Sequence, residues 1–199
     1  MNILRNVNGV VVVVELSNPE HKVAHTKFSF QFESAFANLQ PLDQVDNIAD
    51  INSPSGNPWP TIVCEIANTQ SLPSITRKVN NFWLLPNQVE DVIVIKLWPW
   101  TNCRQDANGL PLRRLTCYKF CRRRSRHTRS GYHPLQTIEF GTITTRQRRY
   151  NGCSARGICT LSIEPACIYA GCPGTPPYPL PGNVVIDLYI IQQAIFRRM

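Results

Sequence analysis

A single carboxylate inside an apolar segment is the first feature of this sequence that could do chemistry. Residues 61 to 67 are β-branched or apolar apart from Glu65, and prolines precede them. Their composition and length predict a buried strand. Burying a carboxylate in a strand is costly unless a cation, a metal ion or hydrogen-bond donors meet it. Lys78, further along the chain, is one candidate partner.

The elements that would position these two groups follow from the local pattern. Ser71 is placed to cap a helix whose first turn tolerates Pro73. Apolar residues then recur at spacings of three and four, which predicts a helix with one apolar face: Leu72, Ile75, Val79, Phe82 and Trp83. Lys78 falls on this helix, and residues 92 to 98 read as a second buried strand. The order strand, helix, strand predicts an α/β unit.

This unit resembles the restriction-endonuclease-like family of the PD-(D/E)XK nuclease superfamily, in the branch whose catalytic lysine lies on the helix. The resemblance runs over residues 41 to 98, and the position two after Glu65 is Ala67 rather than lysine. The matching residues are Pro60, Ile62, Val63, Glu65 and Ile66 in the first strand, Lys78 and Phe82 in the helix, and residues 92 to 95 in the last strand.

The resemblance implies a fold and a reaction. The fold would be α/β, with a small mixed sheet and a flanking helix. Glu65 and an upstream aspartate, Asp43 or Asp46, would hold Mg²⁺ through hard oxygen ligands. The metal would activate water to hydrolyse a phosphodiester of nucleic acid, with DNA favoured over RNA, and Lys78 would orient the water or stabilise charge. The alternative is a fold without activity, in which Glu65 simply pairs with Lys78 or Arg77.

The charge is divided unevenly along the chain. Residues 1 to 100 carry six Lys or Arg against nine Asp or Glu, whereas residues 101 to 199 carry fifteen against four. We therefore expect a core region over 1–100 and a basic, cysteine-rich, irregular β-containing region over 101–199. The basic region would suit a phosphate-rich partner.

Most of the excess positive charge of residues 101–199 comes from two arginine clusters, residues 122–129 and 146–149. The planar guanidinium group of arginine suits contacts with phosphate. They predict a nucleic-acid groove, or alternatively a localisation signal or a solvated loop. The candidate nucleic-acid-binding residues are Arg122, Arg123, Arg124, Arg126, Arg129, Arg146, Arg148 and Arg149.

Seven of the eight cysteines lie between Cys103 and Cys172, and several come in close pairs. Close pairs are how a chain supplies two ligands to one tetrahedral zinc ion. The candidate zinc ligands are Cys117, Cys121, Cys153 and Cys159, with His127 or His133 as substitutes. Disulfides and plain buried thiols are the competing interpretations.

The compartment would decide between zinc and disulfides. The only unbroken apolar run near the N-terminus is residues 10 to 14, too short for a spanning helix or a secretion signal. We therefore expect an intracellular protein, cytoplasmic or nuclear, that does not enter a membrane. Its thiols would then stay reduced.

The remaining segments predict short elements. Residues 9–16 read as a buried strand, and Phe28, Phe30 and Phe32 alternate with polar residues as in a half-exposed strand. Residues 136–140 and 158–163 read as strands. Residues 184–196 fit either a strand or an apolar helix.

Three function classes remain open from the sequence. The first is a Mg²⁺-dependent nuclease or an inactive relative of one. The second is a non-catalytic nucleic-acid or protein-binding module with a zinc-stapled, arginine-rich C-terminal half. The third is a secreted, disulfide-rich interaction protein. The sequence does not indicate the oligomeric state.

Overall fold

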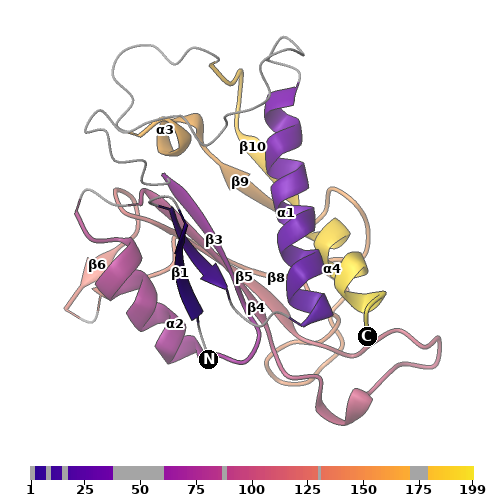
Figure 1. Cartoon of the computed structure of the whole chain (residues 1–199). Helices are drawn as coiled ribbons and strands as arrows, with labels where there is room; N and C mark the ends of the chain where they lie inside the picture. The colour runs from indigo at the N-terminus through magenta and orange to yellow at the C-terminus, as the bar shows by residue number, and fades with distance from the viewer. Residues whose placement is uncertain are drawn as a thin grey trace.

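The computed structural model describes residues 3–7, 10–14, 18–37, 61–86, 89–129, 131–170 and 179–199 (Figure 1). Helices and strands alternate along these residues, so the fold is mixed α/β, as the sequence predicts. The elements in chain order are β1 (Ile3–Val7), β2 (Val10–Val14), α1 (Pro19–Ala37), β3 (Ile62–Ala67), α2 (Leu72–Lys78), the π-helical turn η2 (Val79–Trp83), β4 (Asp91–Leu97), the short helix η3 (Thr101–Cys103), β5 (Leu115–Cys121), β6 (His127–Thr128), β7 (Gly131–Tyr132), β8 (Gln136–Glu139), β9 (Thr160–Ile163), α3 (Pro165–Ile168), β10 (Val184–Asp187) and α4 (Leu188–Phe196).

A four-stranded mixed sheet lies at the centre, in the order β3-β4-β5-β8. Strands β3 and β4 are parallel, and α2 with η2 forms the crossover between them, while the other pairs are antiparallel. This is the predicted strand, helix, strand unit. Every residue of β4 is buried, which explains why it reads as a continuous apolar run rather than an alternating one.

Different elements cover the two faces of this sheet (Figure 1). Helices α1 and α4 and the antiparallel strand pair β9–β10 pack on one face, and α2 with η2 packs on the other. Because side chains alternate along a strand, Ile93 and Ile95 face α1 and α4, whereas Val92 and Val94 face α2. Glu65 pairs in register with Val94, so it too lies on the α2 side.

The strand predicted from the alternating phenylalanines is wrong, because these residues lie in the helix α1. Asn18 caps this helix, its Oδ1 accepting a hydrogen bond from the His21 N–H at 2.9 Å. The exposed fraction is 5% for Phe28 and 4% for Phe36, but 63% for Phe30. The phenylalanines at spacings of four therefore face the core, and the period of two is incidental.

The ambiguous segment 184–196 contains both predicted elements in succession. Strand β10 pairs antiparallel with β9, and α4 begins directly after it at Leu188. Asp187 caps the helix by accepting a hydrogen bond from the Tyr189 N–H at 3.0 Å. Its backbone also bonds to the amide of Gln31, 156 residues earlier in the chain, which fixes α1 against β10.

The sheet crosses the boundary that composition places near residue 100. Strands β4 and β5 lie on either side of that boundary and pair from Asp91↔Cys121 to Leu97↔Leu115. One hydrophobic cluster joins Phe28, Ile95, Leu161 and Ile195. The described residues of the acidic and basic parts therefore share one sheet and one core.

Candidate functional site

The structure brings Glu65 and Lys78 together. The Lys78 ammonium donates to both carboxylate oxygens of Glu65 at 2.7 Å, with 11% of the Glu65 side chain and 29% of the Lys78 side chain exposed. Lys78 occupies the last turn of α2, and its Nζ lies 5.7 Å from the centre of the Trp83 ring. A strand and the helix that follows it thus place the acid and the lysine in one partly buried pair.

The pair satisfies the Glu65 carboxylate without a metal. A hard cation would have to compete with the ammonium for both oxygens. The upstream carboxylates expected to complete a magnesium site, Asp43 and Asp46, lie outside the described residues. The described part of the chain therefore shows an ion pair at this position.

Half of the predicted nucleic-acid-binding arginines form ion pairs with acidic side chains of the protein. Arg122 and Arg123 lie 2.9 and 3.2 Å from the carboxylate of Glu90, of which only 2% is exposed. Arg124 pairs with Glu164, and this hydrogen bond lowers the pKa of the glutamate. Arg149 lies 3.2 Å from Asp106. These four arginines neutralise acids of the fold, so they are poor candidates for phosphate contacts.

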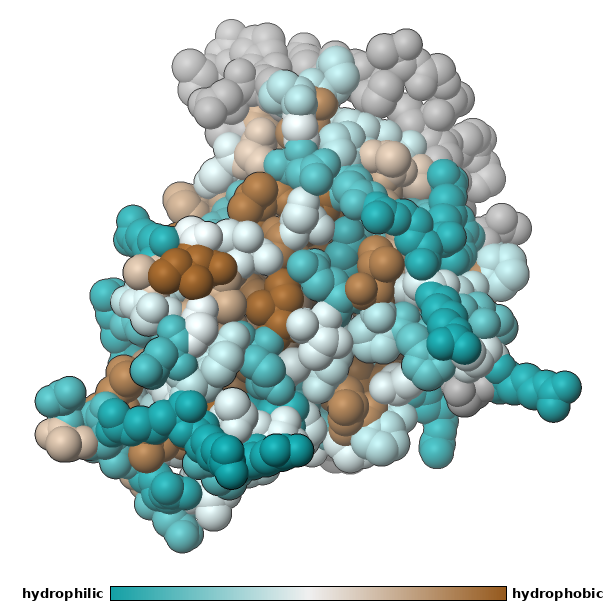
Figure 2. All heavy atoms as spheres, turned by 180° about the vertical axis from the view of Figure 1, so that it is seen from behind, coloured by the Kyte–Doolittle hydropathy of each residue, from teal (hydrophilic) through white to brown (hydrophobic). Residues whose placement is uncertain are grey.

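The other four arginines of the predicted set are exposed and form no ion pair with any described residue: Arg126, Arg129, Arg146 and Arg148. Figure 2 shows one face of the molecule, on which hydrophilic side chains gather at a lower corner and along one flank, between separate apolar patches. Of the four, Arg129 also lines a groove.

That groove, about 760 Å³ in volume, lies between the α2–η2 helix and the β6–β7 hairpin. The Asn80 side chain bridges the two, because its Oδ1 accepts a hydrogen bond from the Tyr132 N–H at 2.7 Å. Gly131 fits this close approach: its φ is +110°, and an added Cβ would come within 2.4 Å of the Asn80 amide. Helix and hairpin are therefore held at a fixed spacing.

The groove is lined by groups that suit a phosphate-bearing ligand. Arg77 and Arg129 are exposed, and no carboxylate is among the lining residues. Asn81 adds amide hydrogen-bonding capacity, and the rings of His127 and Tyr132 lie 4.6 Å apart. Sequence reasoning assigned Arg77 to the helix and missed the two asparagines. The signal was their spacing after Arg77, which places all three on the helix face opposite the buried Ile75 and Val79.

The predicted zinc quartet is not assembled, which corrects the sequence interpretation. Cys117 and Cys121 are four residues apart in β5, a span of about 13 Å in an extended strand. Two thiolates on one zinc ion are only about 4 Å apart. Burial and, to a smaller extent, the neighbouring Cys159, which contacts Cys153, raise the pKa of Cys117 to about 12. Cys117, Cys153 and Cys159 therefore lie together in the core between α1 and the sheet, while Cys121 lies at the far end of β5.

The histidines offered as substitute ligands also lie elsewhere. His127 packs on Tyr132, and His133 Nε2 is hydrogen-bonded to Thr128 Oγ1 at 3.0 Å. Neither belongs to the one group of three potential metal ligands that the described residues contain. All seven cysteines within the described ranges are free thiols.

That group consists of Asp91, Cys121 and Cys167, so a possible metal-binding triad is present. Burial raises the pKa of both thiols, and the charge of Asp91 raises it further. Of these three residues, only Cys121 was among the ligands predicted from the sequence. Asp91 and Cys167 were not predicted as ligands. An acid directly before an all-apolar strand was the signal for Asp91.

Comparison with known proteins gives no relative: no protein-family model, no curated protein and no solved structure matches the chain. None of the described helices combines the length and apolar character needed to cross a lipid bilayer.

Proposed function

We propose that the chain binds nucleic acid through the groove between α2–η2 and the β6–β7 hairpin. The observation that carries this proposal is the pairing of two exposed cations, Arg77 and Arg129, across a groove without carboxylates. Each cation would neutralise one phosphate and release its counterions. Tyr132 and His127 offer ring surfaces on which a base stacks.

The groove favours a single strand over a duplex. Its volume of about 760 Å³ is in the range of small-molecule pockets rather than of a duplex-sized channel. Stacking also requires unpaired bases. In this proposal zinc, which the cysteine spacings predict, has a structural role and takes no part in binding.

The test measures fluorescence anisotropy of labelled single-stranded DNA, single-stranded RNA and duplex DNA at several salt concentrations. We expect Arg77→Ala and Arg129→Ala each to weaken single-strand binding by roughly tenfold, the loss of one charge-assisted contact. The slope of log K against log salt should fall by about 0.7 for each variant.

Arg156→Ala is the matched control, because Arg156 is exposed and does not line the groove. Its binding should equal that of the parent protein. If all three variants bind alike, the groove is not the nucleic-acid site. If the parent protein binds none of the probes at low salt, it is not a nucleic-acid-binding protein.

A second candidate function is metal-dependent phosphodiester hydrolysis on a restriction-endonuclease-like core. The parallel crossover from β3 through α2 to β4 supports it, because it places Glu65 and Lys78 next to each other. Mg²⁺ would have to displace the Lys78 ammonium from a Glu65 oxygen. Glu65 and an upstream aspartate, Asp43 or Asp46, would hold Mg²⁺, and Lys78 would stabilise charge on the phosphate.

The assay for this activity uses single-stranded and plasmid DNA and RNA with Mg²⁺ or Mn²⁺, and EDTA as a blank. Hydrolysis that disappears in Glu65→Gln and Lys78→Met, both still folded by circular dichroism, would establish it. Cleavage retained in both variants would rule this site out. Binding at the groove without cleavage would support the first function alone.

A further inference from the structure

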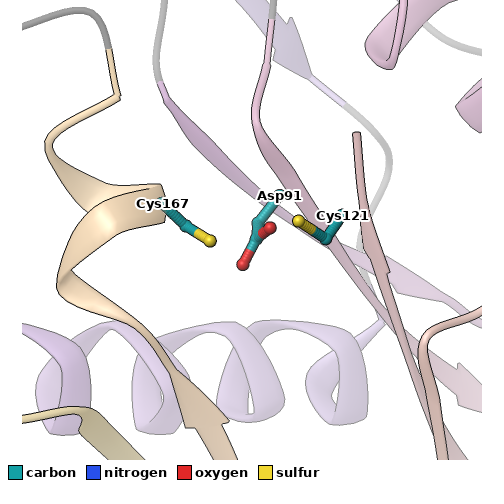
Figure 3. Close-up of side chains that lie close together, drawn as sticks. All are labelled: Asp91, Cys121 and Cys167. Atoms are coloured by element: carbon teal, nitrogen blue, oxygen red, sulfur yellow. The ribbon is translucent and has the colours of Figure 1, made fainter. Parts of the chain in front are cut away.

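Three side chains from separate elements converge inside the protein next to the central sheet. Asp91 begins β4 and Cys121 ends β5, and the two residues are directly paired in register. Cys167 comes from α3 and points toward them (Figure 3). Their candidate ligand atoms, one from each residue, all lie within 4.8 Å of one another. The exposed fraction is 0% for Asp91 and Cys121 and 4% for Cys167.

The carboxylate of Asp91 gives an independent indication that a ligand belongs here. Both of its oxygens are buried and lack a strong donor in good geometry among the described residues, and the thiols of Cys121 and Cys167 are weak donors to it. The Lys119 ammonium forms a buried ion pair with Oδ2 at 3.1 Å and also donates a hydrogen bond to the Ser162 carbonyl at 3.0 Å. One buried ammonium and two weak thiol donors are few partners for a fully buried carboxylate, so this group can also accept a cation placed between it and the two sulfur atoms.

From this convergence we infer that Asp91, Cys121 and Cys167 bind one thiophilic divalent cation of the zinc class. Two sulfur ligands select such a metal over Mg²⁺ or Ca²⁺, which take oxygen ligands. Ligand atoms around tetrahedral zinc are about 3.3 to 3.8 Å apart. Small side-chain rotations from separations of at most 4.8 Å are enough to reach this geometry.

The charges around the position also balance. Two thiolates and one carboxylate carry three negative charges, which the divalent cation and the adjacent Lys119 ammonium together cancel. The carboxylates of Glu90 and Glu164, each 4.0 Å from a ligand sulfur, are neutralised by arginines. Lys119 is itself only 2% exposed, and a buried lysine needs a partner. The metal centre would therefore be neutral as a unit, which is what a dry interior requires.

The place of this centre in the fold indicates a structural role. Helix α3 is a single turn whose N-cap residue, Glu164, makes no capping hydrogen bond with its side chain. Such a turn is marginal by itself. A metal bond from Cys167 to the ends of β4 and β5 would fasten α3 and the adjoining β9 to the central sheet. The site lies on the opposite side of the sheet from α2, so it is separate from the groove.

The experiment measures metal content and cobalt spectra of the whole chain. Protein purified with a thiol reductant is analysed for zinc by mass spectrometry, then stripped and titrated with Co²⁺. We expect the parent to bind one equivalent more than Cys167→Ser, with sulfur-to-cobalt charge-transfer absorption. Cys103→Ser is the matched control, because Cys103 is exposed and outside the group.

Asp91→Asn tests the carboxylate ligand and is expected to weaken cobalt binding at least tenfold. Circular dichroism establishes that each variant is folded, and the stripped parent protein provides a test that needs no variant. Equal metal content in the parent and Cys167→Ser would overturn the inference. So would a stripped parent that gives no thiolate–cobalt band, or a Cys121–Cys167 disulfide found in the reduced preparation.

Discussion

The Glu65–Lys78 pair shows how one contact can serve either stability or catalysis. The carboxylate is mostly buried and both of its oxygens are held by one ammonium. Removing one partner of such a pair leaves the other charge poorly solvated. The stability of variants at these two positions therefore measures how far the pair is structural.

We predict that Lys78→Met lowers the free energy of unfolding by about 1–3 kcal/mol, because Glu65 is left without its donor. Adding Glu65→Gln should recover part of that loss, because the neutral amide is easier to bury. Urea denaturation of both variants measures the difference. An unchanged stability for Lys78→Met would show that Glu65 has another partner.

A second residue-scale prediction concerns Asp106. Hydrogen bonds from the Leu110 N–H and the Asn108 N–H lower the pKa of this carboxyl below 3.8, and Arg149 lowers it further. A carboxyl whose pKa is lower in the folded state stabilises the protein above its unfolded pKa, and this contribution is lost as pH falls.

Asp106→Asn should therefore unfold at a lower urea concentration than the parent at pH 7. The difference should stay constant down to about pH 4, the unfolded pKa of aspartate, and shrink as the pH falls further. Denaturation midpoints at a series of pH values test this. A difference that grows on acidification would contradict the assignment.

At the scale of elements, α1 shows why a period of two and a period of four can be confused. Phe28, Phe30 and Phe32 satisfy alternation, but Phe28, Phe32 and Phe36 also satisfy a helical spacing. The rings of Phe28 and Phe32 are stacked, and those of Phe32 and Phe36 are in tilted contact. Within a longer helix the second pattern prevails, because every backbone group is then paired inside the segment.

We predict that Phe28→Ala costs about 3–5 kcal/mol of unfolding free energy and Phe30→Ala less than about 0.5 kcal/mol. Phe28 is 5% exposed and Phe30 is 63% exposed. Denaturant titration of both variants gives the comparison. A half-exposed strand would instead make the two substitutions equally costly.

The sequence predicts the strand–helix–strand unit because its local signals agree. Ser71 caps α2, accepting a hydrogen bond from the Ser74 N–H, and the flanking strands are continuous apolar runs. It also places Glu65 and Lys78 on adjacent elements. These features depend on interactions between residues near one another in the chain, and the spacing of residue types in the sequence indicates them.

The four cysteines predicted as zinc ligands do not come together, because the fold decides which cysteines are neighbours in space. Cys117 and Cys121 are close in sequence, yet an extended strand separates them, and Cys121 meets a residue of another strand and one of α3. In the same way, Glu90 forms ion pairs with Arg122 and Arg123 because the pairing of β4 with β5 brings these residues together. Close spacing indicates proximity only where the chain turns.

At the scale of the whole molecule, α4 closes the core by contacts to distant parts of the chain. Gln192, 2% exposed, donates hydrogen bonds to the carbonyls of Phe140 at 2.6 Å and Cys153 at 3.3 Å. The amide therefore joins α4 to the loops around the sheet edge, and the other buried residues of that helix are apolar.

We predict that Gln192→Leu lowers the free energy of unfolding by about 1–3 kcal/mol, because buried carbonyls lose their donor. Gln193→Leu is the matched control, since Gln193 is only partly buried and its side chain donates to Gln192 Oε1 and to no backbone carbonyl of the described residues. Thermal unfolding of the two variants is the measurement. Equal midpoints would show that the amide of Gln192 contributes no more than its neighbour.

The bond between Gln31 and Asp187 has a consequence for synthesis. Its partners are 156 residues apart, so the ribosome makes α1 long before it makes β10 and α4, which cover α1. Until then the nascent chain exposes Phe28 and Phe36. Folding must therefore wait for residues 184–196 to emerge, and chaperones that hold apolar segments should associate with the chain during this interval.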